Sequence, residues 1–157
     1  MKKRDGFSLI ELFIVIGFAG VLVAAISVSL FSRKDTLELD RTARQMVATL
    51  RDAQNRSLNQ QNNTSWGVRF ENATNTRPFF ALFKGSTYSQ SSTVTQLPLP
   101  SNVFYATSTL PTSTPITIVF AQVTGRPSAS TSIKLYLSTD GTASATVSVS
   151  PAGLVGL

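Results

Sequence analysis

The feature that most constrains this chain is a long apolar segment near its start. Residues 7–31 carry a single charged side chain, Glu11. The uncharged residues 12–31 alone are enough to cross a membrane, because about 20 residues at a 1.5 Å rise match the roughly 30 Å hydrocarbon core. Basic residues directly before the segment predict a cytoplasmic N-terminus. The sequence therefore predicts a single-pass membrane helix in which Glu11 is a costly exception.

A different helical pattern follows. Residues 33–61 are charged, contain neither proline nor glycine, and repeat apolar or small residues at spacings of four and three. The predicted buried stripe consists of Leu39, Ala43, Met46, Leu50, Ala53 and Ser57, widened by Val47 and Leu58. No helix stop separates the two patterns, so we expect one helix from about Phe7 to about Gln61, roughly 80 Å long. Its first half (7–32) lies in lipid and its second half (33–61) packs on a domain.

The remainder of the chain, residues 62–157, is rich in serine, threonine and β-branched residues and reads as antiparallel β structure. The predicted strands are residues 65–71, 79–84, 116–122, 132–138 and 145–149. Asp140-Gly141 predicts a two-residue hairpin turn between the last two. Residues 86–114 have few apolar anchors and are expected to form a long loop or loose meander. The expected fold class is α+β, a long N-terminal helix packed on a C-terminal antiparallel sheet.

Composition argues against catalysis. The chain has no histidine and no cysteine, which excludes histidine bases, thiol nucleophiles and disulfides. Beyond the leader and the predicted helix the only acidic residues are Glu71 and Asp140, far apart in sequence, and Lys84 and Lys134 show no paired serine motif. No metal-spaced cluster or phosphate-binding loop is present. We expect a protein that is not an enzyme and has no cofactor and no metal.

The start of the chain carries a specific motif. Residues 6–12 read GFSLIEL and follow a short basic leader, residues 1–6. This pattern resembles the processing site of type IV prepilins and type II secretion pseudopilins. The resemblance implies cleavage after Gly6 by a prepilin peptidase, N-methylation of the new terminus at Phe7, and a part for Glu11 and Phe7 in subunit assembly.

The chemistry of these residues agrees with that resemblance. Gly6 lacks a side chain, so a peptidase can approach its carbonyl closely. Cleavage would create a cationic amine on Phe7, which is a natural partner for the Glu11 carboxylate of another subunit. The resemblance further implies an inner-membrane assembly platform with a cytoplasmic ATPase. The subunit would be stored in the cytoplasmic membrane as a single-pass protein and then enter an extracytoplasmic, cell-surface filament.

Three other interpretations compete. An ordinary secretory signal could end at the small residues 23–25, although the apolar run continues to Phe31 and Glu11 interrupts it. A plain signal anchor would carry GFSLIEL by chance. Glu11 taken alone could be an interfacial carboxylate that reaches the lipid headgroups.

Later segments resemble the minor pilins and minor pseudopilins that form filament tips. These are residues 50–71, at the helix end and first strand, and residues 116–157. A major shaft pilin and a tip binding module for adhesion or DNA uptake remain alternatives. DNA binding is expected to be weak, because removing the leader lowers the formal charge from +6 to +4. Leu154, Val155 and Leu157 also stand where DNA-binding relatives carry basic residues.

Overall fold

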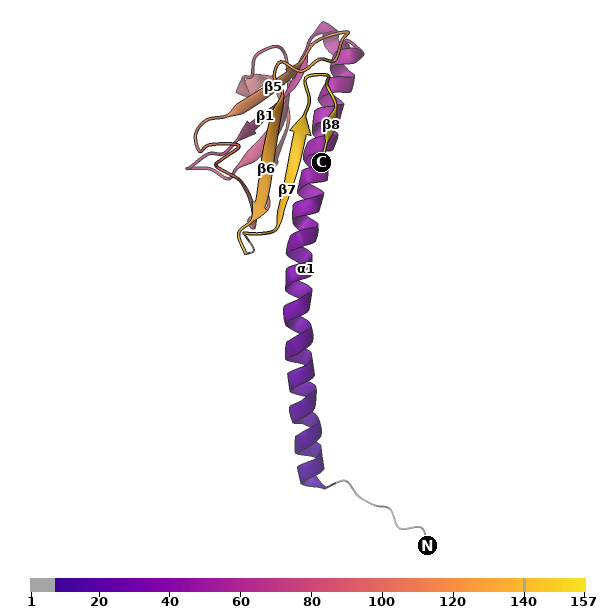
Figure 1. The fold of residues 1–157 in the computed structure, drawn as a ribbon, viewed down its shortest axis with the longest axis vertical. Helices are drawn as coiled ribbons and strands as arrows, with labels where there is room; N and C mark the ends of the chain where they lie inside the picture. Colours follow the sequence, from indigo (N-terminus) through magenta and orange to yellow (C-terminus); the bar gives the residue numbers. More distant parts are fainter. Residues whose placement is uncertain (1–7, 140) are drawn as a thin grey trace. The chain divides into compact units, whose positions relative to one another are not determined.

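The computed structural model describes residues 8–139 and 141–157, except for the side chains of residues 24–33. The chain divides into two compact units, Met1–Lys34 and Asp35–Leu157. Helix α1 (Leu9–Leu58) supplies residues to both units, and every strand belongs to the second (Figure 1).

Helix α1 nearly matches its predicted bounds. It begins where the Ser8 carbonyl accepts hydrogen bonds from the amides of Glu11 (3.0 Å) and Leu12 (3.2 Å). It ends at Leu58, because Gln60 takes the left-handed conformation (φ 52°), which an α-helix cannot continue through. A short 3-10 helix, η1 (Gln61–Asn63), follows. The predicted start at Phe7 lies outside the described residues.

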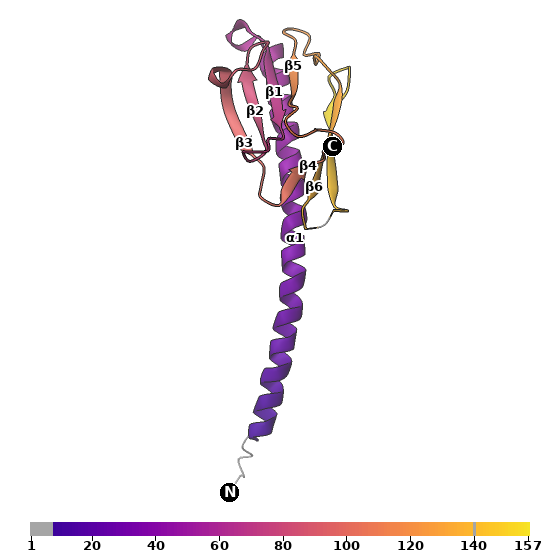
Figure 2. The same cartoon turned by 90° about the vertical axis from the view of Figure 1, so that its left-hand side faces the viewer.

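Within the described residues, eight strands form two antiparallel sheets. Their bounds are β1 (Trp66–Glu71), β2 (Phe79–Lys84), β3 (Thr93–Pro98), β4 (Val103–Tyr105), β5 (Ile116–Phe120), β6 (Thr131–Leu137), β7 (Ser144–Val149) and β8 (Val155–Gly156). The first sheet has the order β3-β2-β1-β5 and the second the order β4-β6-β7-β8. Figure 2 shows β1, β2 and β3 side by side in the first sheet, and β4 beside β6 in the second.

The five predicted strands are present as β1, β2, β5, β6 and β7. Residues 86–114 are not a plain loop, because they contain a 3-10 turn, η2 (Gln90–Ser92), and strands β3 and β4. Strand β3 pairs with β2 as in the loose meander expected as the alternative. Strand β3 lies at a sheet edge with mostly exposed side chains, and β4 is only three residues long. Neither strand therefore shows the apolar alternation by which a strand is recognised in a sequence.

The hairpin between β6 and β7 is wider than predicted. Tyr136 pairs with Ser144, and the Leu137 amide donates to the Ala143 carbonyl at 3.2 Å. Residues 138–142 therefore connect the strands, in place of a two-residue turn at Asp140-Gly141. Asp140 itself lies outside the described residues.

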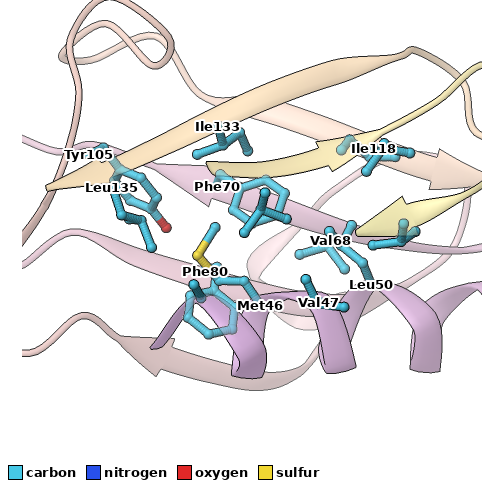
Figure 3. Close-up of a cluster of buried hydrophobic side chains, with 14 of the residues drawn as sticks. Met46, Val47, Leu50, Val68, Phe70, Phe80, Tyr105, Ile118, Ile133 and Leu135 are labelled. Atoms are coloured by element: carbon cyan, nitrogen blue, oxygen red, sulfur yellow. The ribbon is translucent and has the colours of Figure 1, made fainter. Parts of the chain in front are cut away.

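The core of the second unit lies between α1 and the inner faces of both sheets. Every member of the predicted stripe on α1 is buried, with Met46, Leu50 and Ala53 fully so; of the two flanking residues Val47 is buried and Leu58 is exposed. Figure 3 shows Met46 and Leu50 pointing toward Val68, Phe70 and other side chains from both sheets. The fold is α+β, with an N-terminal helix packed on antiparallel sheets in a pilin-like arrangement.

Candidate functional site

The candidate assembly surface is the first part of α1, and only part of the predicted site falls within the described residues. Gly6 and Phe7, the predicted cleavage and methylation positions, lie outside them. Glu11 lies in the first turn of α1 and is exposed. A carboxylate in the first turn interacts favourably with the helix dipole.

The apolar residues around Glu11 are exposed on every side of the helix. The exposed large side chains are Leu9, Ile10, Leu12, Phe13, Ile14, Val15, Ile16, Phe18, Val21, Leu22 and Val23. Residues 12–16 are consecutive, and successive residues turn by about 100°, so together they cover the whole circumference. A helix that is apolar all round is stable where other apolar groups surround it. Apolar neighbours would therefore stabilise this segment.

Two glycines leave the helix surface open within this segment. A Cβ atom placed on Gly17 or Gly20 would meet no atom within 4 Å. Small residues at such positions let the backbones of two helices approach closely. Gly17 and Gly20 thus provide room for a neighbouring helix beside the apolar surface.

Glu11 is the chemical exception in this surface. Ile14 and Val15 lie three and four residues ahead of it and so share its helix face, and both are exposed. Once apolar partners cover that face, an ionised carboxylate there is stable only with a cation or hydrogen-bond donor. Glu11 is thus the position in this segment at which burial would require a polar partner.

The predicted membrane segment is described only in part. The side chains of residues 24–33 lie outside the described ones. Among the described residues, no helix combines the length and the apolar character needed to cross a membrane.

In the second unit, polar side chains of α1 form hydrogen bonds to the backbone of segments that pack beside the helix. The Gln54 side-chain amide donates to the carbonyls of Gly125 (3.0 Å) and Gly153 (2.9 Å). Arg51 donates to the Val155 carbonyl at 2.9 Å. These bonds hold the turn after β5 and the C-terminal strand against the helix. Sequence reasoning missed both residues, because their partners lie about 70 to 100 positions away.

Asp35, at the start of the second unit, also bonds α1 to distant parts of the chain. Its carboxylate accepts hydrogen bonds from the Asn102 side-chain amide at 2.9 Å and from the Thr139 hydroxyl at 3.0 Å. One carboxylate thus joins α1 to the turn before β4 and to the connection between β6 and β7. Charged residues of α1 beside the buried stripe serve to position the β domain.

Within the described part of the chain, no group of three or more metal-ligating side chains is gathered in one place.

Comparison with protein-family models, with curated proteins and with solved structures finds no match to this chain. The functional proposal therefore rests on the fold and on the exposed apolar segment around Glu11.

Proposed function

We propose that this chain is a subunit of a type IV pilus-like or type II secretion pseudopilus filament, with a mechanical rather than catalytic function. The observation that carries the proposal is the helix segment around Glu11, which exposes apolar side chains on every side and bears one carboxylate. The pilin-like arrangement of the second unit supports it. The GFSLIEL motif adds cleavage between Gly6 and Phe7 by a prepilin peptidase.

In this proposal the subunit is stored in the cytoplasmic membrane before assembly, with its N-terminus in the cytoplasm. An assembly platform with a cytoplasmic ATPase then extracts it, and the helices of successive subunits bundle along the filament axis. The exposed apolar surface of α1 becomes the contact with neighbouring helices, and other pilin or pseudopilin subunits are the partners.

Glu11 would set the register between subunits. In the filament core the carboxylate would approach the Phe7 amine of another subunit, and the attraction between opposite charges grows as the dielectric constant falls. Desolvation offsets much of that gain, so the pair need not add stability over an apolar contact. An axially shifted helix would, however, leave both charges buried and unpaired, which is costly.

Two measurements test the proposal. Mass analysis of the mature N-terminus from the native host should find a methylated Phe7. A mature chain that begins at Ile26 would instead support an ordinary secretory signal.

The second measurement compares Glu11→Leu with the parent chain in cleaved membrane protein and in sheared filaments. Normal cleavage with poor incorporation is expected. Glu38→Leu is the matched control, because Glu38 is an exposed glutamate on the same helix but outside the apolar segment. Equal incorporation of Glu11→Leu and Glu38→Leu would reject the pairing, and loss of cleavage would assign Glu11 to the peptidase.

We further propose a minor position at or near the filament tip, because residues 50–71 and 116–157 resemble minor pilins. Quantifying the subunit in purified filaments tests this. A chain that makes up most of the filament mass would be a major shaft pilin instead.

A further inference from the structure

A cleft lies on the outer face of the first sheet, opposite the side that packs on α1. Val68 and Ile118 are buried in the core, and side chains alternate along a strand. Arg69 on β1 and its cross-strand partner Thr117 on β5 therefore project to the other face. Together with the loop after β2 and the turn after β5 they line a cleft of about 690 Å³. This volume falls within the range of small-molecule sites.

Arg69 is held in place on one wall of the cleft. Its Nε donates to Glu71 Oε2 at 2.8 Å, and its guanidinium carbon lies 4.4 Å from the centre of the Tyr88 ring. The Tyr88 ring meets the Phe83 ring edge-on at 5.4 Å, and its hydroxyl donates to Gln90 Oε1 at 3.0 Å. The guanidinium is thus oriented before a ligand arrives, and it has further N–H donors beyond the one bound to Glu71.

Arg126 stands in the turn after β5, and its backbone is also fixed. The Ala121 amide donates to the Arg126 carbonyl at 2.8 Å, and the Ser128 amide donates to the Val119 carbonyl at 2.7 Å. The Arg126 side chain is exposed, and none of the ion pairs among the described residues involves it. The cleft therefore has a second cation on a rigid backbone.

The rest of the lining combines hydroxyl residues with three apolar ones, Val119, Ala121 and Pro127, and none of the lining residues is acidic. The hydroxyl residues are Ser65, Ser86, Thr87, Thr117 and Ser128. Hydroxyls donate and accept hydrogen bonds, as sugar hydroxyls do. Guanidinium groups form paired hydrogen bonds to a planar carboxylate. A second cleft of about 480 Å³ shares Arg69 and Tyr88 with the first, and its lining adds one cation, Arg77, and one carboxylate, Glu71.

We propose that this cleft binds an acidic saccharide, with its carboxylate on Arg69 and Arg126 and its hydroxyls on the serines and threonines. A nucleic acid fits less well, because single strands bind through many cations and through bases stacked on aromatic rings. Here the Arg69 guanidinium already lies over the Tyr88 ring, so that face of the ring is not open to a base. The cleft belongs to the second unit alone and would exist whether or not the chain assembles into filaments.

Titration calorimetry on the full chain in detergent micelles tests the proposal. The probes are trigalacturonate, trimannuronate and sialyllactose at millimolar concentration, each with its methyl ester as an uncharged control. We expect at least one acid to bind roughly tenfold or more tightly than its ester, because charge-assisted hydrogen bonds are lost in the ester.

Variants place the binding in the cleft. Arg126→Gln should weaken binding roughly tenfold while leaving the unfolding midpoint unchanged, because the side chain is exposed. Lys134→Gln is the control, because Lys134 is exposed on β6 in the other sheet, and binding should stay within about twofold. Failure of all three acids to bind, equal binding of the esters, or unaltered binding by Arg126→Gln would overturn the proposal. Tighter binding of a single-stranded oligonucleotide than of any acid would assign the cleft to nucleic acid.

Discussion

A single hydroxyl on α1 should have a measurable effect on stability. Ser57 is fully buried, and its Oγ accepts a hydrogen bond from the Trp66 backbone amide at 2.8 Å. Trp66 is the first residue of β1, so this bond joins the end of the helix to the start of the first sheet. Ser57→Ala removes the acceptor and leaves a buried N–H group without a partner.

The magnitude follows from two opposing effects. A buried donor left unsatisfied costs about 1–3 kcal/mol. Alanine has a better helix propensity than serine, which returns roughly 0.5 kcal/mol. We therefore expect a net loss of about 1.5 kcal/mol. With an unfolding entropy of about 2.1 cal/mol/K per residue over residues 35–157, this lowers Tm by about 6 °C.

Unfolding of the full chain in detergent micelles, followed by fluorescence and circular dichroism, measures the loss. Trp66 is the only tryptophan and is buried, so its emission reports unfolding of the core. Thr49→Ala is the matched control, because the Thr49 hydroxyl bonds to the Gln45 carbonyl within the same helix. That control should change stability by no more than about 0.5 kcal/mol. A loss for Ser57→Ala as small as that of the control would refute the argument.

Three further outcomes are expected. Gly67→Ala should destabilise the fold by about 3 kcal/mol or more in urea unfolding, because a Cβ there would lie 2.6 Å from the Ile118 carbonyl oxygen and 2.7 Å from the Phe83 ring. A loss below about 1 kcal/mol would contradict this. Burial raises the pKa of Tyr105 well above its usual value of about 10. The unfolded chain therefore loses this proton first, so the free energy of unfolding keeps its full value below about pH 10 and should fall as the pH rises above 10. Tyr105→Phe should flatten that fall in alkaline unfolding curves, and an unchanged slope would exclude Tyr105 as its cause. The full chain should bind duplex DNA only weakly in mobility shifts at physiological salt, and submicromolar affinity would overturn this expectation.

Much of the helix was predictable from the sequence. The spacing of four and three residues predicted the stripe from Leu39 to Ser57, and the structure confirms its burial. The helix end at Leu58 was missed by a few residues, because left-handed Gln60 carries no glycine or proline signal. The cleavage site at Gly6 and Phe7 and the pairing of Glu11 remain predictions, since they concern other molecules.

The sequence by itself therefore determined the features that depend on near neighbours: the apolar segment, the buried face of α1, and five strands. Those features follow from the spacing of apolar residues within one segment, which can be read without knowing where the other segments lie. Only the tertiary structure decided the rest. It divided the strands into two sheets, added β3 and β4, bonded Gln54 to turns about 70 and 100 residues away, and brought Arg69 and Arg126 to one cleft. Strand order and turn position depend on packing between segments that are distant in sequence. The pattern of residues within one segment does not specify which of the distant segments it will contact.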